Sequence, residues 1–295
     1  MLKYILVIVL IYIVLFILNM SHFERTILYK FFTRGGLRNT MSVPKDNVAV
    51  GEGFKDILLS PFYYHRHKIT KISDGILLNF YCYHDKYFEK CREMSSKMFW
   101  NDYFNENGVK TPKLYATTKP YQVYQPILPN AEYISKPEHG LRGIGIRVIK
   151  GDEIRPTENN HLIQEKIDAC GHKGGRSFRV VTTYDGELVS VEELKNDNKV
   201  TSNGSTGGNV KMCSGDMCGE YQKLHKPIKK LCELHKRDFA DCFCIGWDVL
   251  VDCKDAYVIE GNWPNGLFNV KDDNTDEFYD MFKPKVEKFY ALNNI

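Results

Sequence analysis

Two carboxylates and one amide, on Asp248, Glu260 and Asn262, are the side chains whose types and spacing best fit a chemical site. They adjoin two apolar runs, Val249–Val251 and Ala256–Ile259, which are joined by a polar turn, a pattern typical of a β-hairpin. Asp248 is expected to open the first strand, and Glu260 and Asn262 to close the second on one face. These oxygens suit Mg²⁺ when phosphate oxygens complete its shell. The alternative is a hairpin with solvated acidic ends.

A lysine and a glycine loop lie upstream of this hairpin. Lys136 ends a predicted strand over 133–136, and a second strand is predicted over 146–149. The loop between them contains Gly140, Gly143 and Gly145. Glycines let backbone N–H groups approach phosphate oxygens closely, and lysine adds a positive charge. The loop is not a dinucleotide fingerprint, which needs a helix after it, and a plain hairpin loop is the alternative.

Two further cations lie in predicted regular elements. An apolar stripe predicts a helix over 84–107, ended by Gly108, and Lys97 lies beside that stripe. The residues of the apolar stripe are Tyr87, Cys91, Met94 and Met98. Arg179 lies inside an apolar strand over 177–183, where a buried charge would need a partner. Taken singly, this lysine is most simply solvated and this arginine is most simply a surface residue.

The rest of the sequence predicts further strands, two helices and one polar segment. An Asp-Gly turn joins the strand of Arg179 to a second strand over 187–194. Other strands are predicted over 121–127 and 162–167. Helices are predicted over 219–225 and 228–239, separated by Pro227, because proline breaks or kinks a helix. The polar segment 196–209 is a linker or an active-site loop.

The amino terminus predicts a membrane anchor. The run from Tyr4 to Leu18 has no charged side chain, and no small-residue cleavage site follows it, which favours an uncleaved anchor over a signal peptide. Basic residues follow it, at positions 25, 30, 34 and 38, so the positive-inside rule places the rest of the chain in the cytosol. Nine cysteines without framework spacing suit a reducing compartment, and a net charge of +3 gives no argument for nucleic acid.

From about Lys97 to Gly266, the chain resembles the ATP-grasp superfamily, especially ribosomal-protein glutamate ligases, glutathione synthetases and sugar-transfer-associated ATP-grasp proteins. The most specific match is the family's metal pattern, found here as Gly246-Trp247-Asp248 and Glu260-Gly261-Asn262. Phe178-Arg179-Val180 looks like the family's Ile-Arg-Val strand. Weaker matches are the helix lysine Lys97 before Gly108 to Pro112, the strand lysine Lys136, the hinge at 164–167 and the Ser-Asn-x-x-x-Gly-Gly spacing at 202–208. Lys166, Ser177 and Thr206 depart from the family's residues.

This resemblance implies an α+β ATP-grasp fold, with two lobes of antiparallel sheet around a nucleotide cleft. The expected division is an anchor over 1–20, a basic tether over 21–45, a reduced α/β region over 46–115 and an ATP-grasp domain over 116–295. The first lobe would cover 116–167, and the second lobe, with the metal site, would cover 168–295.

The resemblance also implies the roles of individual residues. Asp248, Glu260 and Asn262 would bind Mg²⁺, or Mn²⁺ in its place, while Arg179, Lys136 and Asn209 would be catalytic. ATP would contact Lys97, Lys136, Gly140, Gly143, Gly145, Gln164, Glu165, Lys166, Ile167 and Asp168. The implied activity is an ATP-dependent carboxylate–amine ligase that forms an acyl phosphate from a small-molecule, peptide or glycan substrate. The alternatives are a kinase on the same fold and a membrane-bound nucleotide-binding protein without turnover.

Overall fold

The computed structural model describes five main segments of the chain, residues 85–140, 143–169, 175–196, 209–212 and 221–262, and several positions near the two ends. The chain divides into two compact units: Met1–Arg92 with Asp272–Ile295, and Glu93–Lys271. The predicted tether, most of region 46–115 and the loop 202–208 lie outside the described residues. The catalytic roles proposed from the sequence all fall in the second unit.

The first unit contributes most of helix α6 (Asp85–Met94). Tyr87 and Cys91 on this helix are buried, as the apolar stripe predicted. The Tyr87 hydroxyl lies 3.5 Å from Asn293 Oδ1, so the carboxy-terminal segment packs against the same unit. In the part of the chain that the structure describes, no helix is both long and apolar enough to cross a membrane. The predicted anchor lies largely outside the described residues.

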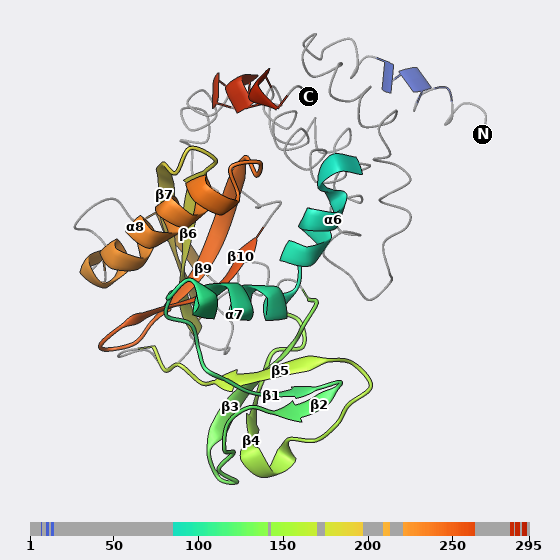
Figure 1. Ribbon diagram of the computed structural model, residues 1–295, viewed down its shortest axis with the longest axis vertical. Coiled ribbons are helices and arrows are strands. Elements are labelled where there is room, and N and C mark those ends of the chain that lie inside the picture. The colour runs from blue at the N-terminus through green and yellow to red at the C-terminus, as the bar shows by residue number, and fades with distance from the viewer. Residues whose placement is uncertain are drawn as a thin grey trace. The chain divides into compact units, whose positions relative to one another are not determined.

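The second unit contains two antiparallel sheets of five strands each. The first has the order β2-β1-β5-β3-β4 and is shown in green in Figure 1. Its strands are β1 (Leu114–Thr118), β2 (Tyr121–Val123), β3 (Glu132–Pro137), β4 (Arg147–Lys150) and β5 (His161–Glu165), with the short 3₁₀ helix η1 (Gly151–Glu153) after β4. Ala116, Tyr133, Ile149 and Ile163 form the core on one face. Lys136 and Gln164 lie on the other face, because they alternate with those core residues along β3 and β5.

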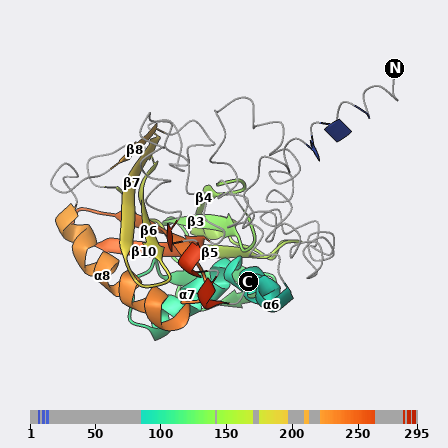
Figure 2. The same ribbon diagram turned by 90° about the horizontal axis from the view of Figure 1, so that it is seen from above.

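The second sheet has the order β10-β9-β6-β7-β8. Its strands are β6 (Gly175–Thr183), β7 (Leu188–Asn196), β8 (Asn209–Met212), β9 (Cys244–Val251) and β10 (Ala256–Asn262). Helix α8 (Tyr221–Asp238) packs against β6, β9 and β10, and Figures 1 and 2 both show it lying along this sheet. The two antiparallel sheets confirm the predicted α+β class, and both predicted hairpins, β6–β7 and β9–β10, are present.

A buried hydrogen-bond chain fastens α8 to the second sheet. The Trp247 Nε1–H donates to Thr182 Oγ1 at 2.8 Å, and Thr182 Oγ1 lies 2.7 Å from His235 Nδ1. The other ring nitrogen of His235 lies 2.8 Å from the Cys242 carbonyl oxygen, which can only accept. His235 Nε2 must therefore carry a proton and donate this bond. This chain places Trp247 on the α8 face, and hence its neighbour Asp248 on the opposite face.

Helix α7 (Lys97–Glu106) lies beside the edge strand β10, between the two sheets in Figure 1. Ser96 caps its first turn, because the Ser96 hydroxyl accepts from the Phe99 N–H at 3.3 Å. The same hydroxyl donates to Glu138 Oε1 at 2.7 Å, which ties the helix to the segment after β3. Asn107 and Gly108 end the helix, Gly108 with φ +65°, as its glycine type predicted.

The three predicted helices are wrong in where they are continuous. The single helix over 84–107 is two helices, because Ser96 adopts an extended backbone and caps α7 instead of continuing α6. Conversely, α8 is one helix with Pro227 inside it. Its buried stripe of Leu224, Ile228, Leu231 and Leu234 spans the proline, and packing of that stripe outweighs the lost backbone hydrogen bond.

Several smaller expectations also need correction. The predicted strand over 121–127 ends at Val123, and a strand missed from sequence, β1, precedes it. Asp248 lies inside β9 and does not open that strand, which begins at Cys244. Among the described cysteines Cys91, Cys232, Cys242 and Cys244 are free, and Cys253 is disulfide-bonded.

Candidate functional site

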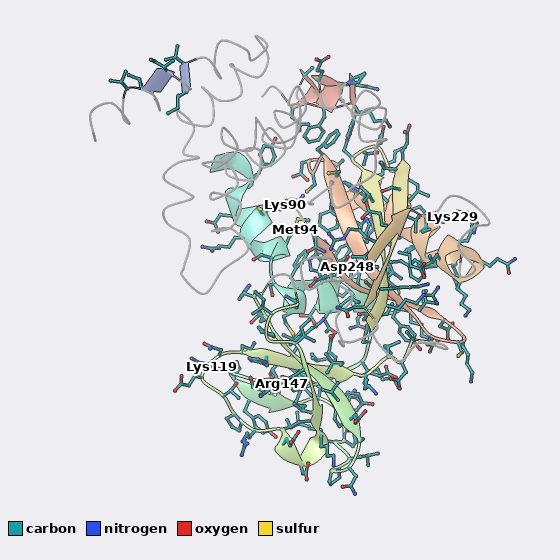
Figure 3. All side chains as sticks on the ribbon, turned by 180° about the vertical axis from the view of Figure 1, so that it is seen from behind. Lys90, Met94, Lys119, Arg147, Lys229 and Asp248 are labelled. Carbon is teal, nitrogen blue, oxygen red and sulfur yellow. The ribbon has the colours of Figure 1, made fainter. Side chains whose placement is uncertain are left out.

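Four charged residues form a row across one face of the second sheet, which is called the charged row below. Glu260 on β10 pairs with Asp248 on β9, Asp248 pairs with Arg179 on β6, and Arg179 pairs with Glu192 on β7. Directly paired residues of antiparallel strands share a face, so all four project from the face opposite α8. Figure 3 labels Asp248 among the side chains of this sheet, and Arg147 marks the first sheet.

A β-bulge makes this alignment possible. The register of β10 against β9 shifts between Val258 and Glu260, which leaves Ile259 as the extra residue. If the register of Val258 opposite Val249 continued, Glu260 would be opposite Trp247 and would face α8. With the bulge, Glu260 is opposite Asp248, and Asn262 is opposite Gly246 on the same face.

Arg179 and Asp248 form a two-pronged ion pair. Arg179 Nε donates to Asp248 Oδ1 at 2.9 Å, and the second nitrogen, Nη2, donates to Oδ2 at 3.0 Å. Asn262 Nδ2 also lies 3.2 Å from Asp248 Oδ2 and 3.3 Å from the Gly246 carbonyl oxygen. Two parallel hydrogen bonds fix the orientation of both side chains. Asp248 is therefore the partner that a charge inside an apolar strand was expected to need.

Two lysines from other elements approach Glu260. Lys97, the first residue of α7, lies 3.6 Å from Glu260 Oε2 and donates to the Gly140 carbonyl oxygen at 2.7 Å. Lys136, on β3 of the first sheet, is only 3 % exposed, and its charge interacts with that of Glu260. Lys97 is 6 % exposed, so the structure overturns the expectation that it is simply solvated.

The pKa shifts reflect this convergence. Burial lowers the pKa of Lys136 to about 8, with Glu260 opposing the shift and Lys97 adding to it. Burial alone would raise the pKa of Glu260, but Lys97, Lys136 and Arg179 together hold that pKa below its usual range. Burial raises the pKa of Asp248, while the Arg179 guanidinium opposes that rise. A shifted lysine beside a cationic cluster is a feature of sites that bind anions.

Helix α7 presents two sides, and each contributes to the site. Lys97 and Asn101 are four residues apart and therefore lie on one side of the helix. Lys97 approaches Glu260, and Asn101 Oδ1 accepts from Gln164 Nε2 of the first sheet at 3.3 Å. Trp100 lies on the other side, with its ring centroid 5.3 Å from that of Trp247. A Cβ on Gly261 would lie 2.7 Å from Trp100 Cζ2, so the ring fits only because residue 261 is glycine.

The residues predicted to line the adenine hinge do not share one environment. Gln164 is buried on β5, on the same face as Lys136. Glu165 Oε2 accepts from the Lys113 N–H, and the Lys166 amine pairs with Glu132 at 2.8 Å and Asp168 at 2.9 Å. The side chains of Lys166 and Asp168 are therefore engaged with each other near the surface, and Ile167 follows β5 between them.

The structure describes only part of the glycine loop, and only the backbone of Asn209. Gly143 and Gly145 have positive φ angles of 71° and 78°, which glycine adopts without strain. The Gly140 carbonyl receives the Lys97 amine, so this loop is tied to α7. Asn209 begins β8, where its backbone pairs with Lys195. Its predicted catalytic role, like the roles assigned to the glycines, stays a prediction.

Glu192 is the member of the charged row that the sequence reasoning missed. The Asp-Gly turn alone does not give this pairing, because the Thr183 N–H donates to the Glu187 carbonyl across the turn, and that register would place Arg179 opposite Val191. Val191 precedes this glutamate, but Glu193 follows it directly. Arg179 pairs with Glu192 in the structure because the register shifts between Val181 and Thr182.

The residues predicted to bind a metal fit a hard cation in chemistry. Asp248 and Glu260 are adjacent carboxylates on one face, and Asn262 lies on the same face with its amide nitrogen 3.2 Å from Asp248 Oδ2. Within the described ranges, no group of three or more His, Cys, Asp or Glu side chains is arranged as a metal site, so the donor set is two carboxylates and an amide. Such a set leaves most of the coordination shell to phosphate oxygens and water.

Comparison with known proteins gives no match in sequence: no protein-family profile and no curated protein matches this chain. The structure is similar to that of a D-alanine–D-alanine ligase from Bacillus anthracis complexed with ATP, with 12% identity, a TM-score of 0.48, and coverage of 68% of this chain and 67% of that chain. It is also similar to the ATP-grasp ligase PsnB, complexed with a phosphomimetic variant of minimal precursor, Mg and ADP (11% identity, TM-score 0.45, coverage 83% and 75%).

A third similar structure is a RiPP-associated ATP-grasp ligase from Chryseobacterium gregarium, in complex with ADP and a leader and core peptide. Its identity is 14%, its TM-score 0.42, and the alignment covers 65% of this chain and 60% of that chain. The solved structures to which this chain is similar therefore include ATP-grasp ligases, the superfamily that its motifs resemble.

Proposed function

We propose that this protein is an ATP- and Mg²⁺-dependent carboxylate–amine ligase that acts through an acyl phosphate. The observation that carries the proposal is the convergence on Glu260 of two buried lysines, Lys97 from α7 and Lys136 from the first sheet, beside the Asp248–Arg179 pair of the second sheet. Buried cations and carboxylates from separate elements cost free energy to bring together, and a bound Mg²⁺–polyphosphate would satisfy both sets of charges.

Each group has a role that follows from its position. Lys97 and Lys136 would bind phosphate oxygens from the side of the first sheet and α7, with the 140–145 loop covering them. Asp248, Glu260 and Asn262 would hold Mg²⁺, which supplies Lewis-acid polarisation of the phosphates when bound. Arg179, already positioned by Asp248, would stabilise negative charge on the phosphoryl group during transfer.

The reaction then needs no nucleophilic side chain. A substrate carboxylate oxygen attacks the γ-phosphorus of ATP, and the bond from that phosphorus to the bridging oxygen of ADP breaks. An amine nitrogen next attacks the acyl carbon, the carbon–oxygen bond to phosphate breaks, and inorganic phosphate leaves with the electron pair of that bond. The nitrogen gives a proton to the phosphate, which leaves the neutral amide. The protein positions the reactants and stabilises charge, as phosphoryl transfer requires.

The proposal includes a membrane anchor over the apolar run 4–18, with the site on the cytosolic side. The basic residues that follow the run support this orientation. The Cys253 disulfide argues against it, because disulfides are rare in the reducing cytosol. Attaching a reporter that is glycosylated only outside the cytosol to the carboxy terminus tests the orientation directly, and glycosylation of that reporter would refute it.

The catalytic proposal is tested with the full chain in a non-ionic detergent. Binding of Mg²⁺–ATP is measured first by calorimetry, and phosphate release is then measured with a panel of amino acids, dipeptides and sugar acids, each with and without an added amine. A ligase releases phosphate from ATP only when a carboxylate and an amine are both present. ADP formation that follows a hydroxyl compound alone would instead indicate a kinase.

Two variants sharpen this test. Glu260→Gln removes a metal ligand and the partner of Lys97, and it should lower turnover at least about 100-fold. Glu158→Gln makes the same chemical change at an exposed position outside the site and should leave turnover unchanged. Absence of Mg²⁺–ATP binding by the parent chain would refute the proposed function.

A further inference from the structure

The carboxylate of Glu192 is buried without a partner. Its side chain is only 2 % exposed, and its Oε2 atom is fully covered with no hydrogen bond. The nearest cation in the charged row is Arg179, opposite Glu192 on β6, but Arg179 directs Nε and Nη2 to Asp248. Among the described residues, Glu192 therefore has no ion pair.

The next residue on β7, Glu193, is a buried glutamate whose carboxylate does have partners. Glu193 lies on the opposite face of β7, where its Oε1 accepts from Arg176 Nε at 2.6 Å and lies 3.2 Å from the Lys195 amine. It is also well buried, but with two cationic partners. The lack of a partner is thus particular to the face of β7 that carries the charged row.

An unpaired buried carboxylate destabilises a fold, so its presence needs a reason other than stability. Burial raises the pKa of Glu192 to about 7, with the charge of Asp248 adding to the rise and that of Arg179 opposing it. A carboxyl group poised near neutrality can hold a cation when ionised and can accept a proton. The Oε2 atom is therefore an acceptor without a hydrogen bond, which a donor from outside the protein would satisfy.

The position of Glu192 limits what that donor can be. In the charged row, Glu192 lies one strand beyond Arg179 and two beyond Asp248, about 5 Å and about 10 Å away at the usual strand spacing. A divalent cation needs several oxygen ligands, and Glu192 offers a single carboxylate next to a guanidinium. An ammonium group needs fewer partners, because it can be held by one carboxylate and the substrate itself.

This inference rests on the proposed ligase function. In that function Arg179 binds the transferred phosphoryl group, and Asp248 and Glu260 bind the metal. The acyl carbon is joined to the phosphorus through one oxygen. It therefore lies on the Glu192 side of Arg179. The attacking nitrogen must approach that carbon from a point away from the nucleotide. Glu192 is the described carboxylate on that side of the charged row.

We propose that Glu192 binds the ammonium group of the acceptor amine and takes one proton from it. The ammonium nitrogen transfers a proton to Oε2, which leaves a neutral amine with a free electron pair. That pair forms the carbon–nitrogen bond, and the carbon–oxygen bond to phosphate breaks with its electrons going to phosphate. The nitrogen, positively charged after the attack, then gives its second proton to the departing phosphate, which leaves a neutral amide. The proton on Glu192 passes to the departing phosphate or to water, which restores the carboxylate.

Binding measurements test this assignment without knowledge of the natural substrates. The full chain in non-ionic detergent is saturated with Mg²⁺ and adenylyl imidodiphosphate, and saturation-transfer NMR is recorded with matched pairs of probes. The amines are ethylamine, glycinamide, L-alaninamide and putrescine, and their hydroxyl counterparts are ethanol, glycolamide, lactamide and 1,4-butanediol. At least one amine should bind the parent chain tenfold more tightly than its hydroxyl counterpart.

Three variants test whether Glu192 is the group that binds the amine. Glu192→Gln should reduce the affinity for that amine at least tenfold while Mg²⁺–nucleotide affinity stays within twofold, and Glu192→Asp should restore part of the amine affinity. Glu158→Gln is the matched control and should behave as the parent. A parent chain that binds nucleotide without preferring any amine, a Glu192→Gln variant that keeps the preference, or a loss of Mg²⁺ affinity instead would each overturn the assignment. Failure of the parent to bind Mg²⁺–nucleotide would refute the proposed function itself.

Discussion

Replacing Glu192 by glutamine should make the folded protein more stable at neutral and alkaline pH. The pKa of this carboxyl rises from 4.5 to about 7 in the folded state, mainly through burial. A shift of about 2.5 units corresponds to about 3 kcal/mol of free energy, at about 1.4 kcal/mol per unit. Glutamine keeps the shape of the side chain and removes this cost of ionisation.

The sign of the pH dependence follows from proton binding. Between pH 4.5 and about 7 the folded state holds the proton of Glu192 while the unfolded state has released it, so the stability of the parent chain falls as pH rises. Below pH 4.5 both states are protonated and the effect vanishes. The stability gain of Glu192→Gln should therefore be small near pH 4.5, grow toward pH 7 and stay near about 3 kcal/mol above it.

The neighbouring residue provides a matched control of opposite sign. Glu193→Gln weakens a buried, hydrogen-bonded ion pair with Arg176 and should cost about 2 to 3 kcal/mol. Urea unfolding of the full chain in detergent at pH 5, 6, 7 and 8 measures both, with tryptophan fluorescence as the signal because Trp100 and Trp247 are buried. A Glu192→Gln variant that is no more stable than the parent at pH 8, or whose gain does not change with pH, would refute the reasoning.

Three further predictions concern the other parts of the site. Gly261→Ala should reduce stability by about 1 to 3 kcal/mol and weaken Mg²⁺–ATP binding, because its Cβ would lie 2.7 Å from Trp100 and would displace the helix that carries Lys97; calorimetric affinity equal to that of the parent would contradict this. Binding of Mg²⁺–ATP at pH 8.5 should take up protons, because the pKa of Lys136 in the free protein is about 8 and phosphate favours its charged form; calorimetry in buffers of different ionisation enthalpy measures the uptake, which Lys136→Met should abolish. Arg179→Lys should lower turnover about 100-fold or more with a smaller effect on Mg²⁺–ATP affinity, because one amine cannot replace the two-pronged contact with Asp248; an affinity loss as large as the loss of turnover would assign Arg179 to nucleotide binding instead.

Local patterns in the chain predicted much of the second sheet. The alternation of apolar residues and the Asp-Gly turn predict the β6–β7 hairpin, and the polar turn after Val251 predicts β9–β10. These signals depend only on neighbouring residues, since strand period and turn chemistry are local properties. The end of α7 was predicted for the same reason, because Gly108 is a local helix stop.

Local patterns failed where packing decides. Ser96 could continue a helix or cap one, and in the structure its hydroxyl accepts the Phe99 N–H of α7 while it donates to Glu138. Pro227 lowers the local preference for helix, but the apolar stripe of α8 packs on the second sheet and keeps the helix continuous. In both cases long-range contacts outweigh an intrinsic preference that is worth at most a few kcal/mol.

The sequence by itself determined the chemistry available to this protein: the carboxylates Asp248 and Glu260, the amide of Asn262, the cations Lys97, Lys136 and Arg179, and the hairpins that carry some of them. Only the tertiary structure decided which of these groups meet. The bulge at Ile259 turns Glu260 to the face of Asp248, α7 buries Lys97 against it, and the pairing of Arg179 with Asp248 leaves Glu192 without a partner. The physical reason is that residue type and local period are encoded position by position, whereas register, facing and burial depend on contacts between segments far apart in the chain.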